Sequence, residues 1–119
     1  DALIFSVPEY NNSISGPFKN AIDWISRDKP NAIAGKPLLM MGVTSGKGAT
    51  LQGMAATRVP LTFLGCHIYP AWLGVAGGRT AFSDDGSKLT DKGYQERLVS
   101  LIDEFLAFAR HHARVPAKT

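Results

Sequence analysis

The feature that most restricts the fold of this chain is the uninterrupted apolar run Pro37-Leu38-Leu39-Met40-Met41-Gly42-Val43, which follows Lys36. A strand with one face in water alternates apolar and polar residues, and this run contains no polar residue. Continuous apolar strands are typical of parallel sheets that helices cover on both faces. The sequence therefore predicts a parallel strand over residues 36–43, buried from both sides.

Two further strands and three helices are predicted around this run. An apolar stretch over residues 2–7 predicts a buried strand that ends at Pro8, which has no N–H for a ladder. A third strand is predicted over 66–69, with an extension through 72–75. The predicted helices cover residues 17–26, 49–64 and 91–112. Alternating strands and helices imply parallel pairing with right-handed crossovers, and 119 residues suit one α/β domain.

The predicted helices carry their own signals. Ser15 is placed to cap the first helix, and Pro17 suits its first turn. Pro60 is expected to kink or restart the second helix, and Thr90 or Asp91 is expected to cap the last. The core stripe of the first helix is Phe18, Ala21, Ile22 and Ile25. The apolar face of the last helix is Tyr94, Leu98, Leu101, Ile102, Phe105, Phe108 and Ala109.

Composition argues against several classes of protein. The net charge is +3, but the basic residues are scattered, which disfavours a nucleic-acid partner. The cluster Arg110-His111-His112-Ala113-Arg114 is interpreted as a solvated helix terminus. No apolar stretch reaches the roughly 18 residues of a membrane span. The only cysteine, Cys66, excludes an internal disulfide and favours a reducing, cytoplasmic location; it is predicted to be a buried structural thiol.

Metal and nucleotide motifs are absent from the sequence. His67, His111 and His112 are expected to lie far apart, so no metal site is predicted. Asp84-Asp85-Gly86-Ser87 is predicted to be a turn rather than a calcium loop. The segment Gly46-Lys47-Gly48 matches neither the dinucleotide fingerprint nor the P-loop, and a simple tight turn is favoured over an anion site.

Two polar loops follow predicted strands and are the places to look for chemistry. The first holds residues 9–13, and the second holds residues 44–48. Ligands of parallel α/β sheets bind outside the carboxyl ends of the strands. Tyr10 could stack on a flat ring while backbone amides bond the polar edge of that ring. An ordinary turn with a tyrosine covering the sheet edge explains the same residues, and spacing alone leaves both readings open.

The stretch from Pro8 to Arg27, with its Pro-Glu-Tyr-Asn loop and Lys-Asn-Ala-Ile-Asp-Trp helix, resembles the signature of the NAD(P)H-dependent FMN reductases. These are flavodoxin-like quinone, chromate and azo-compound reductases. The similarity continues more weakly through Lys36-Pro37, Thr44-Ser45-Gly46 and Phe82-x-x-x-Gly86. It implies a flavodoxin-like three-layer sandwich with a parallel sheet of order 2-1-3-4-5. Residues 1–119 look like the C-terminal portion of one such domain, with strands 3 to 5 and their helices.

The resemblance also implies the function and the site. It implies a flavin-dependent oxidoreductase in which a hydride passes from NADPH or NADH through FMN to a quinone or similar small acceptor. No catalytic side chain is implied, and Lys47 is a candidate to meet a nicotinamide phosphate. The residues implied to bind the flavin are Pro8, Glu9, Tyr10, Asn11, Asn12, Ser45 and Gly46.

The sequence departs from the family in one respect, because the family's Ser/Arg-rich phosphate loop and first two strands have no counterpart. We therefore expect a bare strand edge, a marginal fold and weak FMN affinity for the chain alone. A missing N-terminal segment or second chain is the expected partner, from a cut or incomplete reductase. A homodimer or homotetramer is expected through Trp24, Trp72 or the second helix. The alternative function is a non-catalytic interaction or oligomerisation module.

Overall fold

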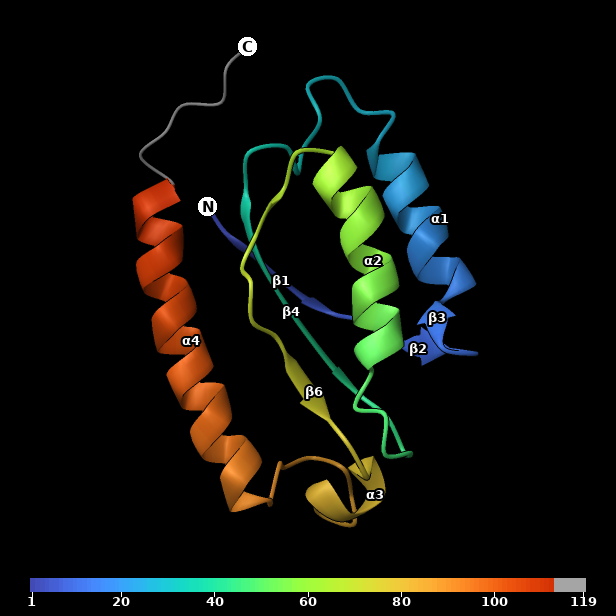
Figure 1. Cartoon of the computed structure of the whole chain (residues 1–119), viewed down its shortest axis with the longest axis vertical. Helices are drawn as coiled ribbons and strands as arrows, with labels where there is room; N and C mark the ends of the chain where they lie inside the picture. Colours follow the sequence, from blue (N-terminus) through green and yellow to red (C-terminus); the bar gives the residue numbers. More distant parts are fainter. Residues whose placement is uncertain (113–119) are drawn as a thin grey trace.

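The computed structural model describes residues 1–112, and its centre is a parallel sheet built around one long strand (Figure 1). The sheet strands are β1 (Leu3–Ser6), β4 (Pro37–Val43), β5 (His67–Ile68) and β6 (Leu73–Val75). Strand β4 pairs with β1 along one edge and with β5 and then β6 along the other, always in parallel. The register places Leu3 opposite Leu38 and Met41 opposite Leu73. The predicted parallel α/β sheet is confirmed.

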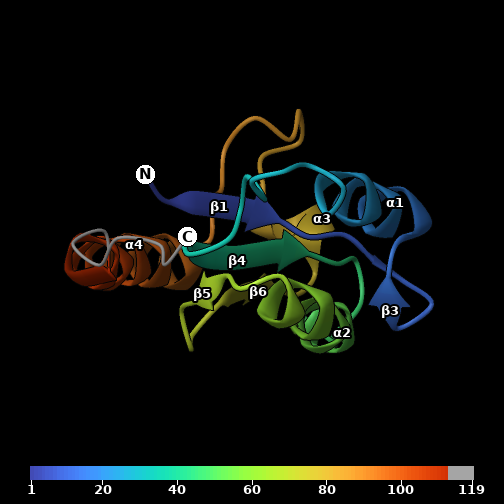
Figure 2. The same ribbon diagram turned by 90° about the horizontal axis from the view of Figure 1, so that it is seen from above.

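Helices cover both faces of this sheet and make three layers (Figure 2). Helices α1 (Gly16–Ile25) and α2 (Leu51–Phe63) lie on one face, and α4 (Lys92–His112) lies on the other. Leu38 and Met40 belong to the core on the α1 and α2 side, whereas Leu39 belongs to the core on the α4 side. All three side chains are fully buried. The apolar run is therefore continuous because alternate side chains of β4 enter two different cores.

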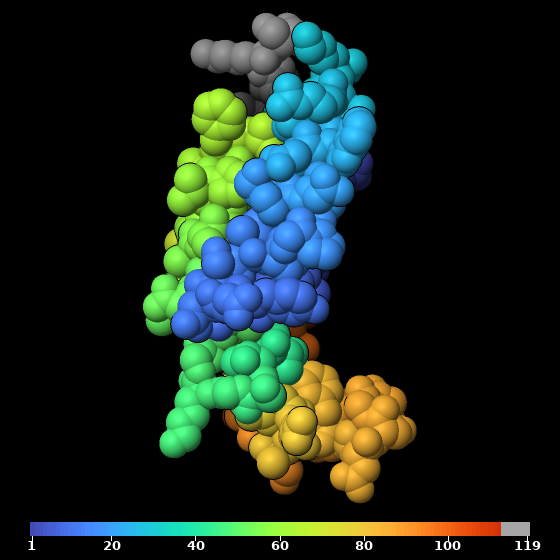
Figure 3. Space-filling view, turned by 90° about the vertical axis from the view of Figure 1, so that its right-hand side faces the viewer, coloured from blue at the N-terminus to red at the C-terminus, as the bar shows by residue number. Residues whose placement is uncertain are grey.

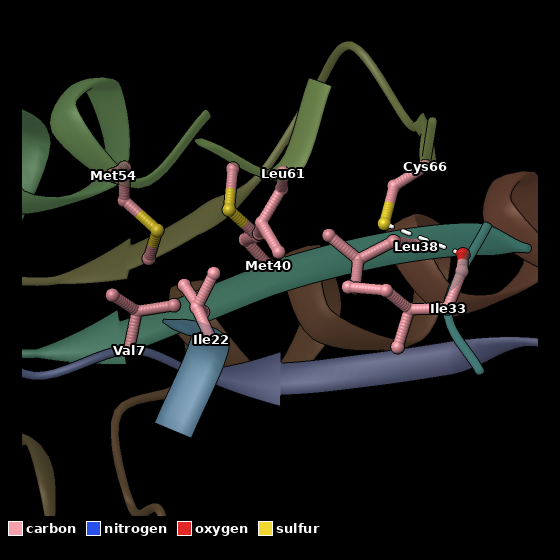
Figure 4. Packing of buried hydrophobic residues seen from close by; sticks show 8 residues of the cluster. All are labelled: Val7, Ile22, Ile33, Leu38, Met40, Met54, Leu61 and Cys66. Atoms are coloured by element: carbon pink, nitrogen blue, oxygen red, sulfur yellow. Dashed lines mark hydrogen bonds between the residues drawn. The ribbon is translucent and has the colours of Figure 1, made fainter. Parts of the chain in front are cut away.

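The core beneath α1 and α2 collects side chains from six segments of the chain (Figure 4). It consists of Val7, Ile22, Ile33, Leu38, Met40, Met54, Leu61 and Cys66. Phe18 and Ile25 pack against it as predicted, but Ala21 is exposed, so that part of the predicted stripe is wrong. Ser15 stands at the N-cap of α1, but its side chain makes no capping hydrogen bond.

The core beneath α4 confirms the predicted apolar face of the last helix except at Ile102, which belongs to neither core. It consists of Leu39, Leu73, Val75, Ala81, Leu101, Phe105 and Ala109. Asp91 caps the helix, since its Oδ1 accepts the Tyr94 N–H at 2.9 Å. Thr90 instead donates its hydroxyl to the carbonyl of Ala81 at 3.1 Å. Of the two predicted caps, only Asp91 is confirmed.

Several boundaries differ from the predictions. Helix α2 runs without a break through Pro60, so the predicted restart there is wrong. The third strand is divided into β5 and β6, with Pro70 between them. A short helix, α3 (Gly78–Ala81), and a hairpin of β2 (Glu9–Tyr10) and β3 (Ser13–Ile14) were not predicted. Each of these differences lies in a connecting segment or at a proline.

Strand β1 is only partly buried, which corrects the prediction of a fully buried strand. Within residues 1–112 it pairs with β4 alone, and its exposure alternates along the strand. Leu3 and Phe5 pack against the α1 and α2 core, while Ile4 is half exposed on the other side. The bare edge expected from the sequence is therefore present in the described part of the chain.

No helix among residues 1–112 combines the length and the apolar character needed to cross a membrane.

The α4 core offers a direct test of the layer arrangement. Phe105 is 1% exposed and Leu106, its neighbour on the same helix, is 42% exposed. We expect Phe105→Ala to lower the free energy of unfolding by roughly 3–5 kcal/mol, because it leaves a cavity beneath the sheet. Leu106→Ala is the matched control, with an expected cost below about 1 kcal/mol. Urea unfolding measures both, and equal costs would contradict this packing.

Candidate ligand-binding site

The segment after β1 forms a β-hairpin over the carboxyl end of the sheet. Glu9 pairs with Ile14 and Tyr10 pairs with Ser13, so Asn11 and Asn12 make the turn. Both asparagines have left-handed backbone angles, with φ of 51° and 58°. Two positive φ values are what the type I′ hairpin turn requires, and asparagine tolerates them better than most residues. The Asn-Asn pair was the signal in the sequence for this hairpin, which we interpreted only as a polar turn.

The side chain of Glu9 holds the hairpin against the first turn of α2. Its Oε2 accepts the N–H of Gly53 at 2.7 Å. Gly53 is the third residue of α2, where helix N–H groups lack partners within the helix. A carboxylate is favourable there because the helix dipole is positive at its N-terminus. The carboxylate of Glu9 therefore binds the helix, and the Gly53 amide already has an acceptor within the chain.

The loop after β4 is tied to the loop after β6 by backbone hydrogen bonds. The Thr44 N–H donates to the Val75 carbonyl and the Gly78 N–H donates to the Thr44 carbonyl, both at 2.9 Å. The Gly77 N–H donates to the Gly46 carbonyl at 3.1 Å. The Gly46 N–H donates to Thr44 Oγ1 at 3.3 Å. The loop is therefore fixed in place, and the Gly46 N–H already has an acceptor.

Two glycines allow these loops to approach the end of the sheet. A Cβ on Gly42 would lie 2.5 Å from the Val7 carbonyl oxygen and 3.0 Å from Thr50 Oγ1. A Cβ on Gly74 would overlap the carbonyl of Ala49. Neither approach tolerates a side chain, so glycine is required for the segments before the hairpin and before α2 to sit this close to β4 and β6.

These contacts bring the two predicted loops to one edge of the molecule. The hairpin and the loop after β4 both flank the N-terminus of α2, and they are neighbours on the face shown in Figure 3. Tyr10 is 62% exposed there. Asn11, Asn12, Ser45 and Gly46 are exposed as well, whereas Pro8 and Glu9 are half-buried. That these residues hold a ligand stays a prediction.

A pocket of about 540 Å³ opens at the same end of the sheet. Val43 and Phe82 give it apolar surface, and Arg79 and Asp84 give it charge. The sequence did not predict this pocket, because its walls come from β4 and from the segment after β6. The turn beside it was predicted. Hydrogen bonds from the Ser83 hydroxyl and from Ser87 hold the pKa of Asp85 down at about 2.

The three histidines lie together, which corrects the expectation that they are far apart. The rings of His67 and His112 have centroids 5.1 Å apart, and those of His111 and His112 lie 5.5 Å apart. The His112 Nδ1 donates to the Phe108 carbonyl at 2.9 Å, and the ring is half-buried rather than solvated. The end of α4 contacts the start of β5, and no local pattern in the sequence predicts this contact. Ala113 and Arg114 lie outside the described residues.

Among residues 1–112, no group of three or more histidine, cysteine, aspartate and glutamate side chains is arranged to hold a metal ion.

Comparison with known proteins gives consistent matches. The model of a family described as NADPH-dependent FMN reductase matches residues 1–80. An NAD(P)H-dependent FMN reductase of Pseudomonas aeruginosa is 38% identical over 93 residues, which cover 77% of this chain and 50% of that protein. A probable NADPH:quinone oxidoreductase of Oryza sativa is 33% identical over 122 residues, which cover all of this chain and 59% of that protein.

A solved structure agrees with these sequence matches. It is the flavoenzyme FerB, an NAD(P)H:(acceptor) oxidoreductase from Paracoccus denitrificans, with a TM-score of 0.79 and 30% identity. The match covers 93% of this chain and 62% of that one. The chain thus spans about half to three-fifths of the length of the relatives it matches.

Cys66 has no role at this edge of the sheet, as the sequence predicted for a structural thiol. It is buried in the core beneath α1 and α2, and its Sγ donates to the Ile33 carbonyl at 3.5 Å (Figure 4). Burial raises the pKa of the Cys66 thiol to about 11. Since the thiolate is the reactive species, the thiol is inert near neutral pH.

We expect alkylation of Cys66 by iodoacetamide at pH 8 to be at least roughly 100-fold slower in the folded protein than in urea, because both the thiolate fraction and access are reduced. The rate should rise with pH toward about 11. Intact mass spectrometry over time measures the rate, and the chain has no other cysteine to confuse it. Equal rates in the folded and unfolded protein would contradict the buried, high-pKa thiol.

Proposed function

We propose, since the chain belongs to the NADPH-dependent FMN reductase family, that it carries the flavin-ring part of an FMN site in an oxidoreductase. The proposed reaction moves a hydride from NADPH or NADH through FMN to a quinone or a similar small acceptor. The observation that carries the proposal is the exposed ring of Tyr10, held on a fixed hairpin at the carboxyl end of a flavodoxin-like sheet. Ligands of such sheets bind at this end.

The residues present fit a flat, polar-edged ring. Tyr10 offers an exposed aromatic face, and the turn at Asn11 and Asn12 offers exposed backbone and amide groups beside it. When bound, FMN supplies the hydride chemistry, and the protein supplies binding and orientation. The proposed flavin site comprises Pro8, Glu9, Tyr10, Asn11, Asn12, Ser45 and Gly46, of which Glu9 has its carboxylate bound to α2. No side chain is assigned an acid or base role, and no residue of this chain is assigned to the FMN phosphate.

Two features at this end of the sheet support sites for co-substrates. Lys47 lies exposed in the loop after β4, and we assign it to a phosphate of the nicotinamide cofactor. The 540 Å³ pocket, lined by apolar Val43 and Phe82 and by charged Arg79, suits a small aromatic acceptor. We also propose that the chain is the C-terminal portion of one flavodoxin-like domain, in which β1, β4 and β5 with β6 are strands 3, 4 and 5. The share of its relatives that it covers supports this.

The flavin site is tested by FMN titration of the purified chain and two variants. We expect Tyr10→Ala to weaken FMN binding by roughly 3- to 10-fold, since aromatic stacking contributes about 0.5–1.5 kcal/mol. Tyr10→Phe is the matched control and should bind FMN nearly as well as the original protein. Flavin fluorescence gives the dissociation constants, and NADPH oxidation with benzoquinone gives the activity. A stable, soluble protein that binds no FMN would refute the proposal and favour a non-catalytic interaction module.

We also propose that the protein forms a homodimer or homotetramer through the outer face of α2. Leu51, Ala55, Val59 and Phe63 recur at four-residue spacing on this face, and Phe63 is 88% exposed. The only charged residue of α2, Arg58, instead lies over the Trp72 ring, with its guanidinium carbon 5.7 Å from the ring centroid. An apolar face without charge can meet a second copy of itself without repulsion. Trp72 packs within the domain.

The oligomer is tested by light scattering after size exclusion. We expect Phe63→Glu to shift the protein toward the monomer, because it places a charge in the proposed contact. Val99→Glu, at another exposed apolar position, on α4, is the control and should leave the mass unchanged. The α2 interface is wrong if the original protein is monomeric or if only Val99→Glu lowers the mass.

A further inference from the structure

We propose that Glu9 is a positioning residue, which acts on the flavin site through α2 and does not itself contact the flavin. The Glu9 carboxylate accepts a hydrogen bond from the Gly53 N–H, and this bond, the Glu9 latch, attaches the β2–β3 hairpin to α2. The latch thereby sets the position of the Tyr10 ring. This inference rests on the flavin site proposed above. It reassigns Glu9 within that site, since the sequence grouped it with the ring-binding residues.

The N-terminus of helix α2 has no capping side chain of its own, and a residue distant in the sequence caps it instead. Ala49 and Thr50 both have left-handed backbone angles, with φ of 49° and 58°. Thr50 stands at the N-cap, but its hydroxyl donates to the Ala49 carbonyl and makes no capping bond to the helix. An N-cap side chain usually accepts a hydrogen bond from the N–H of the third helical residue. In α2 that residue is Gly53, and Glu9, 44 residues earlier, provides the acceptor instead. The start of α2 and the hairpin are thus held by one shared bond.

The absence of a side chain at Gly53 makes room for the Glu9 latch. A Cβ at Gly53 would lie 2.9 Å from the Cβ of Glu9 and 3.1 Å from its Cγ. Glycine is otherwise among the least favourable residues inside a helix. Its presence in the first turn of α2 therefore has a packing reason, which is the close approach of the Glu9 side chain to the helix backbone.

The latch reaches Tyr10 through the geometry of a strand. Successive side chains of a strand point to opposite sides, so a Glu9 bound to α2 turns Tyr10 away from α2 and into solvent. Ile14, the pairing partner of Glu9, packs against the α1 and α2 core. Without the latch, Ile14 and the bond from the Val7 N–H to the Met41 carbonyl still attach the hairpin. Losing Glu9 should therefore loosen the Tyr10 ring without unfolding the domain.

The test compares the FMN affinity of two Glu9 variants, a control variant and a double variant. We expect Glu9→Ala to weaken FMN binding by no more than the roughly 3- to 10-fold expected for Tyr10→Ala, because Glu9 acts only by placing that ring. Glu9→Gln should recover most of that loss, because its amide oxygen can accept the same N–H. Glu96→Ala, at an exposed carboxylate on α4, is the control and should bind FMN normally. In a Tyr10→Ala background, Glu9→Ala should cost little further affinity, since there is no ring left to position.

A substitution at Gly53 tests the latch from its other side, in case the Glu9 variants fail to fold. Gly53→Ala favours the helix but displaces the latch, so it should weaken FMN binding about as much as Glu9→Ala while circular dichroism stays unchanged. The proposal is overturned if Glu9→Ala binds FMN normally, or if its loss is as large without Tyr10 as with it. A loss with Glu9→Gln equal to that with Glu9→Ala also overturns it.

The latch can be judged even if the chain binds no FMN, which would refute the proposed function instead. In that case we expect Glu9→Ala, and not Glu9→Gln, to speed hydrogen exchange at the Gly53 amide and to shift the Tyr10 ring resonances. If neither signal changes, the latch does not position Tyr10 and the inference is wrong.

Discussion

The burial of β4 on both faces is the constraint on which the rest of this structure depends. Leu38 and Met40 enter one core and Leu39 enters the other, so helices must cover the sheet from both sides. That requirement places α1 and α2 together and α4 opposite them. It also fixes where loops can meet, because β1, β4 and β6 run in parallel and end at the same edge.

The candidate site is built on that edge by contacts between segments distant in the chain. The loop after β4 is bonded to residues 75–78, and the hairpin is bonded to α2 through Glu9 and Gly53. Both connections fix backbone rather than bury large side chains, so the edge stays open to solvent and keeps the Tyr10 ring exposed. An exposed aromatic ring and a mixed pocket at the same end of the sheet are a suitable frame for a planar cofactor and a small acceptor.

Sequence reasoning succeeded where burial sets the pattern and failed where contacts are distant. The strand over 36–43 was predicted from an uninterrupted apolar run, and the apolar face of α4 was predicted from helical spacing, so each signal lies within one segment of the chain. The predicted restart at Pro60 was wrong, since α2 continues through the proline with Thr57 and Leu61 on either side of it fully buried. The histidines were misplaced because α4 and β5 meet only in the folded chain. The hairpin was not predicted, although the Asn11-Asn12 pair is typical of the turn that joins its two strands.

By itself, the sequence determined the α/β class, the parallel sheet, the family signature at residues 8–27 and the two loops worth examining. Those follow from local periodicity and from a motif of adjacent residues. The tertiary structure alone decided what Glu9 does, how Gly46 is bonded and which residues line the neighbouring pocket. Each of these depends on a contact between residues far apart in the chain, and the distance between such residues is set only when both cores close around β4.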